Sequence, residues 1–379
     1  MAKILFIQPA FAHYRFKLFE LLHKRHEITF VFLANKSRYP SSTVPNSEWA
    51  TVYLNRKVNP FWMFDLARLI MKIKPEIVIT SNNGSYQSIV AGISGRLLDI
   101  PVILWSEAWY YKKSWKRKSW WKKPFNIMMV NLTSLTAKAI VAGGSKSYKY
   151  NNKLVRGKKP VFLAFQSTVD FAQGVNSLSN EVIELKNSFN GEINILYFSK
   201  IIPLKGLDFL IRAFSQIESH YSNIKLHIVG DGSFRNHCEQ LARELQIKSI
   251  QFYGSVENER AWTYYYLADI FVLPHSGTLI EGWGLVINEA ASMGLPIITT
   301  DAAGAAEDLV VDGVNGYVVE AGNQSALKNA LISLISDKSQ RINMGKQSRL
   351  LFEKINDYSK MANGFEKAIT YILEDQTPR

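Results

Sequence analysis

The chain has 379 residues, of which 47% are hydrophobic and only 20% are charged. This composition excludes an intrinsically disordered protein, and the length exceeds what one hydrophobic core usually serves. The one cysteine, Cys238, excludes an internal disulfide and is typical of a reducing compartment. The apolar run at the start is too short for a signal peptide. The sequence contains no run of about 18 apolar residues, so no membrane span is expected. We expect a folded cytoplasmic protein of two domains.

The net charge of +13 comes from a single stretch of the chain. Residues 108–169 contain fourteen Lys and Arg and no Asp or Glu, which leaves 31 basic against 32 acidic residues elsewhere. Residues 109–124 mix these cations with tryptophans and tyrosines. Lysines attract anionic lipid head groups and tryptophans favour the membrane interface, so the segment predicts contact with an anionic membrane surface. One alternative is nucleic acid, because lysines also meet phosphates and aromatic rings stack on bases. Another is a solvated loop without a partner.

Short apolar runs alternate with stretches of helical spacing along both halves of the chain. The runs are 4–7, 28–33, 77–80, 102–105 and 139–142, then 193–197, 225–229, 250–253, 269–273 and 296–300. Continuous apolar strands separated by helices predict parallel sheets covered on both faces. A stretch rich in Ser and Asn, residues 173–190, is the expected linker. The sequence therefore predicts an α/β protein with two doubly wound, Rossmann-like domains, 1–172 and 191–357.

The segment from Glu281 to Glu289 is the most informative in the chain, and it reads as a glycine turn that opens a helix after a strand. Gly282 and Gly284 allow the backbone to turn tightly and to approach a ligand closely. The first backbone N–H groups of a helix are free to bind an anion. Glu281 would lie at the mouth of the turn, and Glu289 about one and a half turns into the helix. Free N–H groups and two carboxylates suit a sugar nucleotide, which combines a diphosphate with many hydroxyls.

Three further motifs flank this segment in a specific order. They are Tyr197-Phe-Ser-Lys-Ile-Ile-Pro-Leu-Lys-Gly206, Val229-Gly-Asp-Gly232 and Gly304-Ala-Ala-Glu-Asp-Leu-Val-Val-Asp-Gly-Val-Asn-Gly316. With these motifs, the C-terminal half resembles the retaining GT-B glycosyltransferases with a Glu-x7-Glu motif, those of family 4 and glycosyltransferase group 1. The resemblance covers about residues 193–319. It implies a GT-B fold, in which two Rossmann-like domains face a central cleft and the last helix, about 358–379, packs back on the first domain.

The resemblance also implies a donor site. Glu281 would face the donor sugar, Glu289 would bind the ribose hydroxyls, and lysines would offset the charge of the diphosphate. The implied catalytic residues are Glu281, Lys205 and Lys200, and the implied donor-binding residues are Gly284, Leu285, Val286 and Glu289. The chain departs from the family at Ser199-Lys200, where Gly-Arg is usual, and a lysine cannot form the bidentate fork of an arginine. Residues 229–232 and 253–256 follow strands and are candidates for framing the base.

The acceptor side is expected on the N-terminal domain. His13 and Arg15 follow the first strand, and Glu107 follows the strand at 102–105, so all three are candidates for an acceptor site. No metal and no cofactor are expected, because the seven histidines show no ligand spacing and no Asp-x-Asp motif occurs.

The sequence thus predicts a retaining glycosyltransferase that transfers a sugar from a nucleoside diphosphate sugar, with UDP favoured, to a hydroxyl group. The expected acceptor is a lipid-linked saccharide in the synthesis of a cell-surface glycan, and the expected location is the inner face of the plasma membrane. Two alternatives remain open. One is a nucleic-acid-binding protein that uses residues 109–124, and the other is a GT-B enzyme of another reaction type, such as a phosphorylase or an epimerase.

Overall fold

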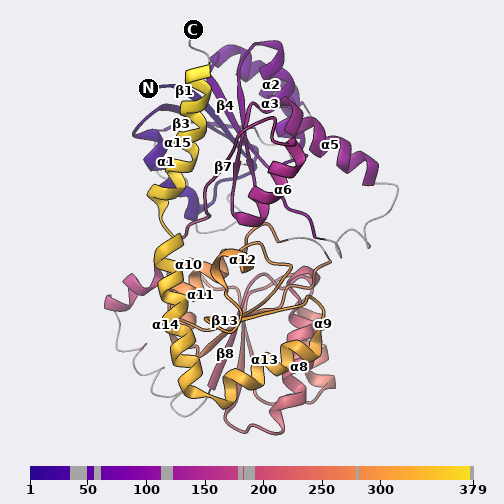
Figure 1. Ribbon diagram of the computed structural model, residues 1–379. Coiled ribbons are helices and arrows are strands. Elements are labelled where there is room, and N and C mark those ends of the chain that lie inside the picture. The colour runs from indigo at the N-terminus through magenta and orange to yellow at the C-terminus, as the bar shows by residue number, and fades with distance from the viewer. Residues whose placement is uncertain are drawn as a thin grey trace. The chain divides into compact units, whose positions relative to one another are not determined.

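The computed structural model describes residues 1–34, 49–54, 61–111, 123–177, 182, 193–278 and 281–375. These residues form two compact units (Figure 1). The first comprises the described residues within 1–110, 118–167 and 357–379, and the second those within 111–117 and 168–356. The described chain passes into the second unit at 111, is back in the first unit by 123, changes unit again after 167 and returns after 356. The sequence suggested a linker at 173–190. Most of that predicted linker lies outside the described residues.

The first unit is built on a parallel sheet whose described strands have the order β3-β2-β1-β4-β5-β6-β7. The strands are β1 (Lys3–Gln8), β2 (Glu27–Phe32), β3 (Ala50–Tyr53), β4 (Ile77–Ser81), β5 (Val102–Ser106), β6 (Ala139–Ala142) and β7 (Val161–Leu163). Consecutive residues of the central strands are apolar, and alternate side chains of a strand point to opposite sides of the sheet. Both faces of the sheet are therefore apolar. In β1, Phe6 belongs to one core cluster while Leu5 and Ile7 belong to another.

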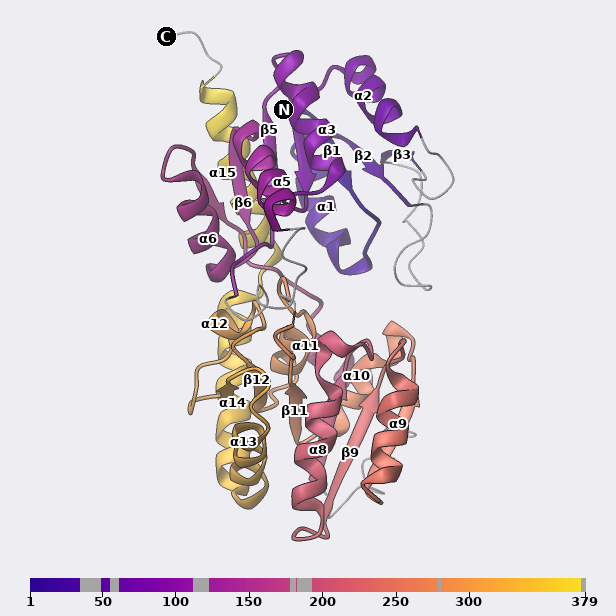
Figure 2. The same cartoon turned by 90° about the vertical axis from the view of Figure 1, so that its right-hand side faces the viewer.

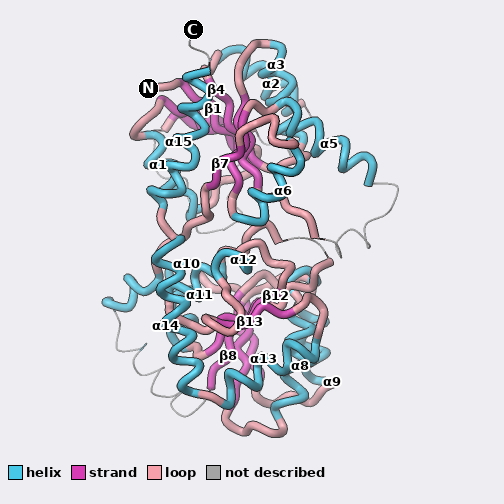
Figure 3. The backbone as a smooth tube through the Cα atoms, in the orientation of Figure 1, coloured by secondary structure: helices cyan, strands magenta, loops and turns pink. Residues whose placement is uncertain are grey.

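Helices cover both faces of this sheet, as Figure 3 shows. The cluster around Phe6 contains residues of α1 (Phe16–His23) and α15 (Tyr358–Asp375), so both helices lie on that face. The opposite face carries α2 (Trp62–Ile73), α3 (Tyr86–Leu97), α5 (Lys123–Thr136) and α6 (Ser145–Val155). In α15, Phe365 packs between Phe6 and Trp105, with ring centroids 6.0 and 5.1 Å apart. The last helix is thus part of the core of the first unit.

The second unit has a parallel sheet with the described strand order β10-β9-β8-β11-β12-β13. The strands are β8 (Ile193–Phe198), β9 (Ile224–Val229), β10 (Ile250–Gly254), β11 (Ile270–Leu273), β12 (Ile297–Thr300) and β13 (Gly316–Val319). This is the doubly wound order, in which successive strands are added outward from β8 on one side and then outward from β11 on the other, so the strand order reverses between β8 and β11. Ligands of such sheets bind beyond the carboxyl ends of the strands at that reversal, so the fold itself points to the loops after β8 and β11.

Helices also cover both faces of the second sheet. One face packs on α8 (Leu207–Glu218), α9 (Arg235–Glu244) and α13 (Gln324–Ser336), which share the largest core cluster. The other face carries α10 (Asn258–Leu267), where Tyr265 packs on Phe271 of β11. The remaining elements are α11 (Val286–Ser292), α12 (Ala306–Leu309), α14 (Lys338–Ile355) and the short 3-10 turns η1 (His13–Arg15), η3 (Phe171–Ser177) and η4 (Pro203–Lys205). The predicted α/β class with two doubly wound parallel sheets is confirmed.

Close packing of α15 on β7 can be tested at Gly364. A Cβ atom at this position would lie 2.4 Å from the backbone oxygen of Leu163. In an unpacked helix, alanine is favoured over glycine by about 1 kcal/mol, so the sign of the effect depends on this contact. We expect Gly364→Ala to lower the free energy of unfolding in urea by about 1–3 kcal/mol.

The matched control is Asn363→Ala, one residue earlier in the same helix, where the side chain is exposed. This variant should be as stable as the native chain or slightly more stable. A gain in stability for Gly364→Ala would contradict the packing described.

Candidate functional site

Two loops meet at the carboxyl edge of the second sheet, at the reversal between β8 and β11. Gly206 follows η4 in the loop after β8, with a left-handed φ of 69°. A Cβ atom there would lie 1.9 Å from the backbone oxygen of Pro274, in the loop after β11. Only glycine permits this approach, because any other residue would be strained and would also clash. The contact brings the side chain that precedes Gly206 beside the loop of Glu281.

That side chain is Lys205, whose ammonium group forms an ion pair and a hydrogen bond with the carboxylate of Glu281. Both side chains are largely buried, with 14% and 19% of their surface exposed. The Nε2 atom of the fully buried His275 lies 3.7 Å from the same carboxylate. Two of the predicted catalytic residues are therefore in direct contact. His275 was not predicted for this site because its position after β11 carries no distinctive motif.

The third predicted catalytic residue, Lys200, lies apart from this pair at the end of β8. Its side chain is exposed, and its backbone oxygen accepts a hydrogen bond of 3.3 Å from the hydroxyl of Tyr197. Of the two lysines predicted after β8, the fold brings Lys205 to Glu281.

The glycine turn and the helix after it follow the expected plan. Gly284 has a left-handed φ of 97°, and α11 begins at Val286 with Leu285 as its N-cap. The first N–H groups of a helix lack acceptors within the helix, so the turn supplies donors for an anion. Glu281 anchors the start of the turn through a bridge to Ala303, beyond β12.

Glu289 lies in α11 and is partly buried against α10. The hydroxyl of the fully buried Tyr265 donates a hydrogen bond of 2.7 Å to its Oε2 atom. Burial raises the pKa of Glu289 to about 7, although the hydrogen bond from Tyr265 acts in the opposite direction. The ring of Tyr265 stacks on Phe198 at a centroid distance of 5.0 Å, which fixes the hydroxyl toward the carboxylate. Tyr265 was missed because one tyrosine within an aromatic helix gives no signal in a single sequence.

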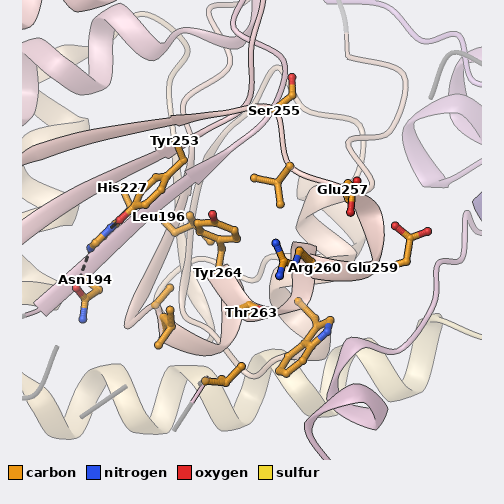
Figure 4. Close-up of a pocket in the computed structure, with 15 residues that line it drawn as sticks. Asn194, Leu196, His227, Tyr253, Ser255, Glu257, Glu259, Arg260, Thr263 and Tyr264 are labelled. Atoms are coloured by element: carbon orange, nitrogen blue, oxygen red, sulfur yellow. Dashed lines mark hydrogen bonds between the residues drawn. The ribbon is translucent and has the colours of Figure 1, made fainter. Parts of the chain in front are cut away.

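A cavity of about 630 Å³ lies between α10 and the sheet. Figure 4 shows Asn194, His227 and Tyr253 in a row on neighbouring strands of its wall. The imidazole of His227 forms hydrogen bonds of 2.8 Å with the Asn194 side chain and with the Tyr253 hydroxyl. Burial lowers the pKa of His227 to about 4, so the ring is neutral near pH 7. The wall includes Tyr253 and Ser255 of the segment predicted to frame a base.

In the first unit, a polar cluster lies at the carboxyl ends of β1 and β5. The guanidinium of Arg15 pairs with Glu107 at 3.0 Å, donates to the side-chain oxygen of Gln8, and lies 4.4 Å from the ring centroid of Trp105. The amide of Gln166 donates to the same Glu107 oxygen at 2.9 Å. Two predicted acceptor residues are thus paired, and Gln8 and Gln166 join them without having been predicted. The third, His13, lies on the same 3-10 turn as Arg15 and packs edge-on against Tyr14.

Within the described ranges, no group of three or more His, Cys, Asp or Glu side chains is placed to hold a metal ion. Among the described helices, none is long and apolar enough to cross a membrane. Residues 112–122, which make up most of the predicted basic and aromatic segment, lie outside the described residues.

Residues 180–351 match the family model of glycosyl transferases group 1. The match contains the loops after β8 and β11, the glycine turn and both glutamates. The second unit therefore carries a glycosyl transferases group 1 domain.

Curated relatives are similar over part of their length. A GDP-mannose-dependent α-(1-6)-phosphatidylinositol monomannoside mannosyltransferase of Mycolicibacterium smegmatis is 29% identical over 160 residues, which is 41% of this chain and 42% of that protein. The capsular polysaccharide biosynthesis glycosyltransferase CapM of Staphylococcus aureus is 29% identical over 237 residues, or 60% of each chain. The chain thus spans about two fifths of the length of the first relative and three fifths of the second.

The solved structure of Anabaena HepE in complex with UDP is similar in fold across nearly the whole chain. Its TM-score is 0.77 at 16% sequence identity, and the superposition covers 97% of this chain and all of that one. The chain has the GT-B fold.

The raised pKa of Glu289 predicts how stability depends on pH. The ordinary pKa of this carboxyl is 4.5, and the folded state raises it to about 7. The folded state therefore favours the protonated form, and the free energy of unfolding falls as pH rises from about 4.5 to about 7. Glu289→Gln stays neutral throughout and keeps an oxygen that accepts from Tyr265. We expect it to be more stable than the native chain by about 1–3 kcal/mol at about pH 8 and to show no gain near pH 4.5.

Tyr265→Phe serves as the companion variant, because it keeps the ring and removes the hydroxyl. Loss of the donor raises the pKa of Glu289 further, so this variant should lose more stability at about pH 8 than at about pH 5. Urea unfolding at several pH values measures both effects. A stability of Glu289→Gln that changes with pH in parallel with the native protein would refute the pKa shift.

Proposed function

We propose that this protein is a retaining glycosyltransferase that moves a sugar from a nucleoside diphosphate sugar to an acceptor hydroxyl. The observation that carries the proposal is the contact of Lys205 with Glu281 at the strand reversal of a glycosyl transferases group 1 domain. Glu289 of α11 adds a second carboxylate at the same edge of the sheet, and it accepts a hydrogen bond from Tyr265 of α10. A cation, free helical N–H groups and two carboxylates match the diphosphate and hydroxyl groups of such a donor.

In this mechanism the ion pair keeps the empty site neutral. An entering diphosphate competes for Lys205, because a charge-assisted contact with a phosphate oxygen replaces the one with Glu281. Glu281 then accepts hydrogen bonds from hydroxyls of the donor sugar, with His275 behind it. Gly284, Leu285 and Val286 donate backbone N–H groups to the phosphate, and Glu289 accepts hydrogen bonds from the ribose.

The proposed transfer occurs on one face of the sugar. The bond from the anomeric carbon to the diphosphate oxygen breaks, and the bond to the acceptor oxygen forms on the same side. The acceptor proton passes to the departing diphosphate oxygen, so no protein base is required. Lys205 and the helical N–H groups offset the charge that develops on the leaving diphosphate, which lowers the barrier without a metal ion.

We favour a UDP-sugar as the donor. UDP is the nucleotide bound in the HepE structure, whose superposition covers 97% of this chain. The competing donor is GDP-mannose, which the name of the Mycolicibacterium smegmatis relative specifies.

The proposed acceptor is a lipid-linked saccharide used in the synthesis of a cell-surface glycan. The names of two relatives support this class, since one acts on a phosphatidylinositol mannoside and the other serves capsular polysaccharide synthesis. Arg15 and Glu107 of the first unit, with His13 beside them, are the proposed acceptor-side residues. The protein would work at the inner face of the plasma membrane, with residues 109–124 against anionic lipid. Nucleic-acid binding is an outcome that the titration below distinguishes, and a product formed without an acceptor would reveal another GT-B reaction, such as that of a phosphorylase or an epimerase.

Calorimetric titration with UDP-, GDP-, ADP- and dTDP-sugars tests the donor. We expect micromolar binding of UDP-sugars by the native chain. Glu289→Ala should weaken it about 10- to 100-fold, because hydrogen bonds to a charged group contribute roughly 1.5–3 kcal/mol. If GDP-mannose bound more tightly than the UDP-sugars, the proposed donor would be GDP-mannose. Binding of none of the four, together with binding of single-stranded RNA, would overturn the transferase proposal in favour of the nucleic-acid alternative.

Substitutions of Lys205 and Lys200 test the chemical step, with Lys200 as the control. Both lysines follow β8, and Lys205 is the one that contacts Glu281. The rate of donor hydrolysis without acceptor gives the readout, checked against unfolding to confirm that each variant folds. We expect Lys205→Met to lower the rate about 10- to 100-fold and Lys200→Met to have the smaller effect. Equal losses, or a larger loss for Lys200→Met, would contradict the role given to the ion pair.

A further inference from the structure

Exposed apolar side chains gather on three neighbouring helices of the first unit. Among the described residues, 23 large hydrophobic side chains are exposed, and twelve of them lie on α2, α3, α5 or the residues that flank them. These twelve are Phe61, Met63, Phe64, Met71, Tyr86, Ile93, Leu97, Leu98, Phe125, Ile127, Met128 and Leu135. Half of the exposed apolar side chains thus come from about a tenth of the chain, which is unusual for a surface that faces only water.

The outward side of α2 shows the pattern most clearly. Phe61, Phe64 and Met71 recur at helical spacing on its exposed side, while Leu66 and Ile70 are buried in the core cluster. A helix that is apolar on both sides is normally buried on both sides. Phe64 nevertheless exposes 66% of its surface.

The same pattern continues across α3 and α5. On α3, Ile93 and Leu97 lie one turn apart, and on α5, Met128 and Leu135 lie two turns apart. Leu97 exposes 80% and Leu135 67% of their surface. The helices α2 and α3 are in contact, as are α3 and α5, and Figure 2 shows them together on the same side of the first sheet. We call the outward side of these three helices the apolar layer.

The helices α3 and α5 approach each other closely. A Cβ atom on Gly92 of α3 would lie 2.1 Å from the Oγ1 atom of Thr136, the last residue of α5. This contact fixes the positions of α3 and α5 relative to each other, so their exposed apolar side chains belong to two helices that are packed together.

The charges of the three helices are predominantly positive. Asp65 is their one acidic residue, against Arg68, Lys72 and Arg96, whose side chains are exposed. The sequence adds to this imbalance, because the fourteen basic residues within 108–169, including those that precede α5, have no acidic residue among them. A surface of this kind is complementary to one that is both apolar and anionic.

We propose that the apolar layer of α2, α3 and α5 docks on an anionic lipid bilayer. Its phenylalanine, methionine, leucine and isoleucine side chains enter the interface, and the cations on the same helices meet lipid phosphates. A second copy of the chain fits less well, because it would bring an equal positive charge to the contact. The proposal extends beyond residues 109–124 and does not depend on the transferase activity.

Flotation with vesicles tests this surface. The native chain should bind vesicles of phosphatidylcholine mixed with phosphatidylglycerol more tightly than vesicles of phosphatidylcholine alone. The variant Phe64→Ser, Leu97→Ser, Leu135→Ser removes one exposed side chain from each helix, and we expect it to reduce the partition coefficient at least about tenfold. The matched control, Leu245→Ser, Ile342→Ser, Leu350→Ser, changes three exposed side chains of the second unit and should bind as the native chain does.

Three outcomes would overturn the proposal. They are no binding of anionic vesicles by the native chain, an equal loss in the two triple variants, and full binding by the variant of the apolar layer. Light scattering without vesicles measures the molar mass in solution and so tests whether a second copy of the chain covers the apolar layer. A native dimer that the Phe64, Leu97 and Leu135 variant converts to a monomer would assign the surface to a second copy and would likewise refute lipid docking.

Retention of binding by Lys112→Ser, Lys113→Ser, Lys116→Ser, Arg117→Ser, Lys118→Ser would support the apolar layer as the main contact. Loss of binding in this variant alone, with the apolar-layer variant unaffected, would contradict it.

Discussion

The candidate site depends on one close contact between two loops of the second sheet. Gly206 must be glycine, because its backbone is left-handed and a Cβ atom would collide with the backbone oxygen of Pro274. This contact holds the loop after β8 against the loop after β11, so that the ammonium group of Lys205 forms an ion pair with the carboxylate of Glu281. Since β8 and β11 are the strands between which the sheet reverses, the ion pair forms where a doubly wound fold offers its binding edge. The chemistry proposed for the protein therefore follows from a backbone constraint.

Glu289 adds an electrostatic cost to the folded state. Burying a carboxyl raises its pKa to about 7, and the hydrogen bond from Tyr265 offsets only part of that effect. A neutral glutamine would fit the same space at a lower cost in stability. Under the proposed function, hydrogen bonds from the ribose hydroxyls to this carboxylate would offset the cost when the donor is bound.

The sequence predicted the central strands well and the edge strands poorly. Each predicted apolar run is a strand, whereas β3, β7 and β13 were missed. These three lie at edges of their sheets, where they are short and only partly buried, so they lack the continuous apolar run that reveals a central strand. In the candidate site, the motifs pointed to Glu281, Glu289 and Lys205, because turn glycines and charges leave a local pattern, and their site roles stay predictions. Tyr265, His275 and Gln166 reach their partners only through tertiary packing, which no local pattern records.

The two units carry different kinds of surface. The second presents cations, N–H groups and carboxylates for a polar ligand, and the first combines the paired Arg15 and Glu107 with the apolar layer of α2, α3 and α5. If both proposals hold, the second unit takes the donor from water and the first unit contacts the membrane.

A crystal structure with UDP would test the central claim most directly. We expect the diphosphate to lie within hydrogen-bond distance of Lys205 Nζ and of the backbone N–H groups of Leu285 and Val286, and the ribose hydroxyls to donate hydrogen bonds to Glu289. A diphosphate bound elsewhere, with the pair of Lys205 and Glu281 unchanged, would contradict it.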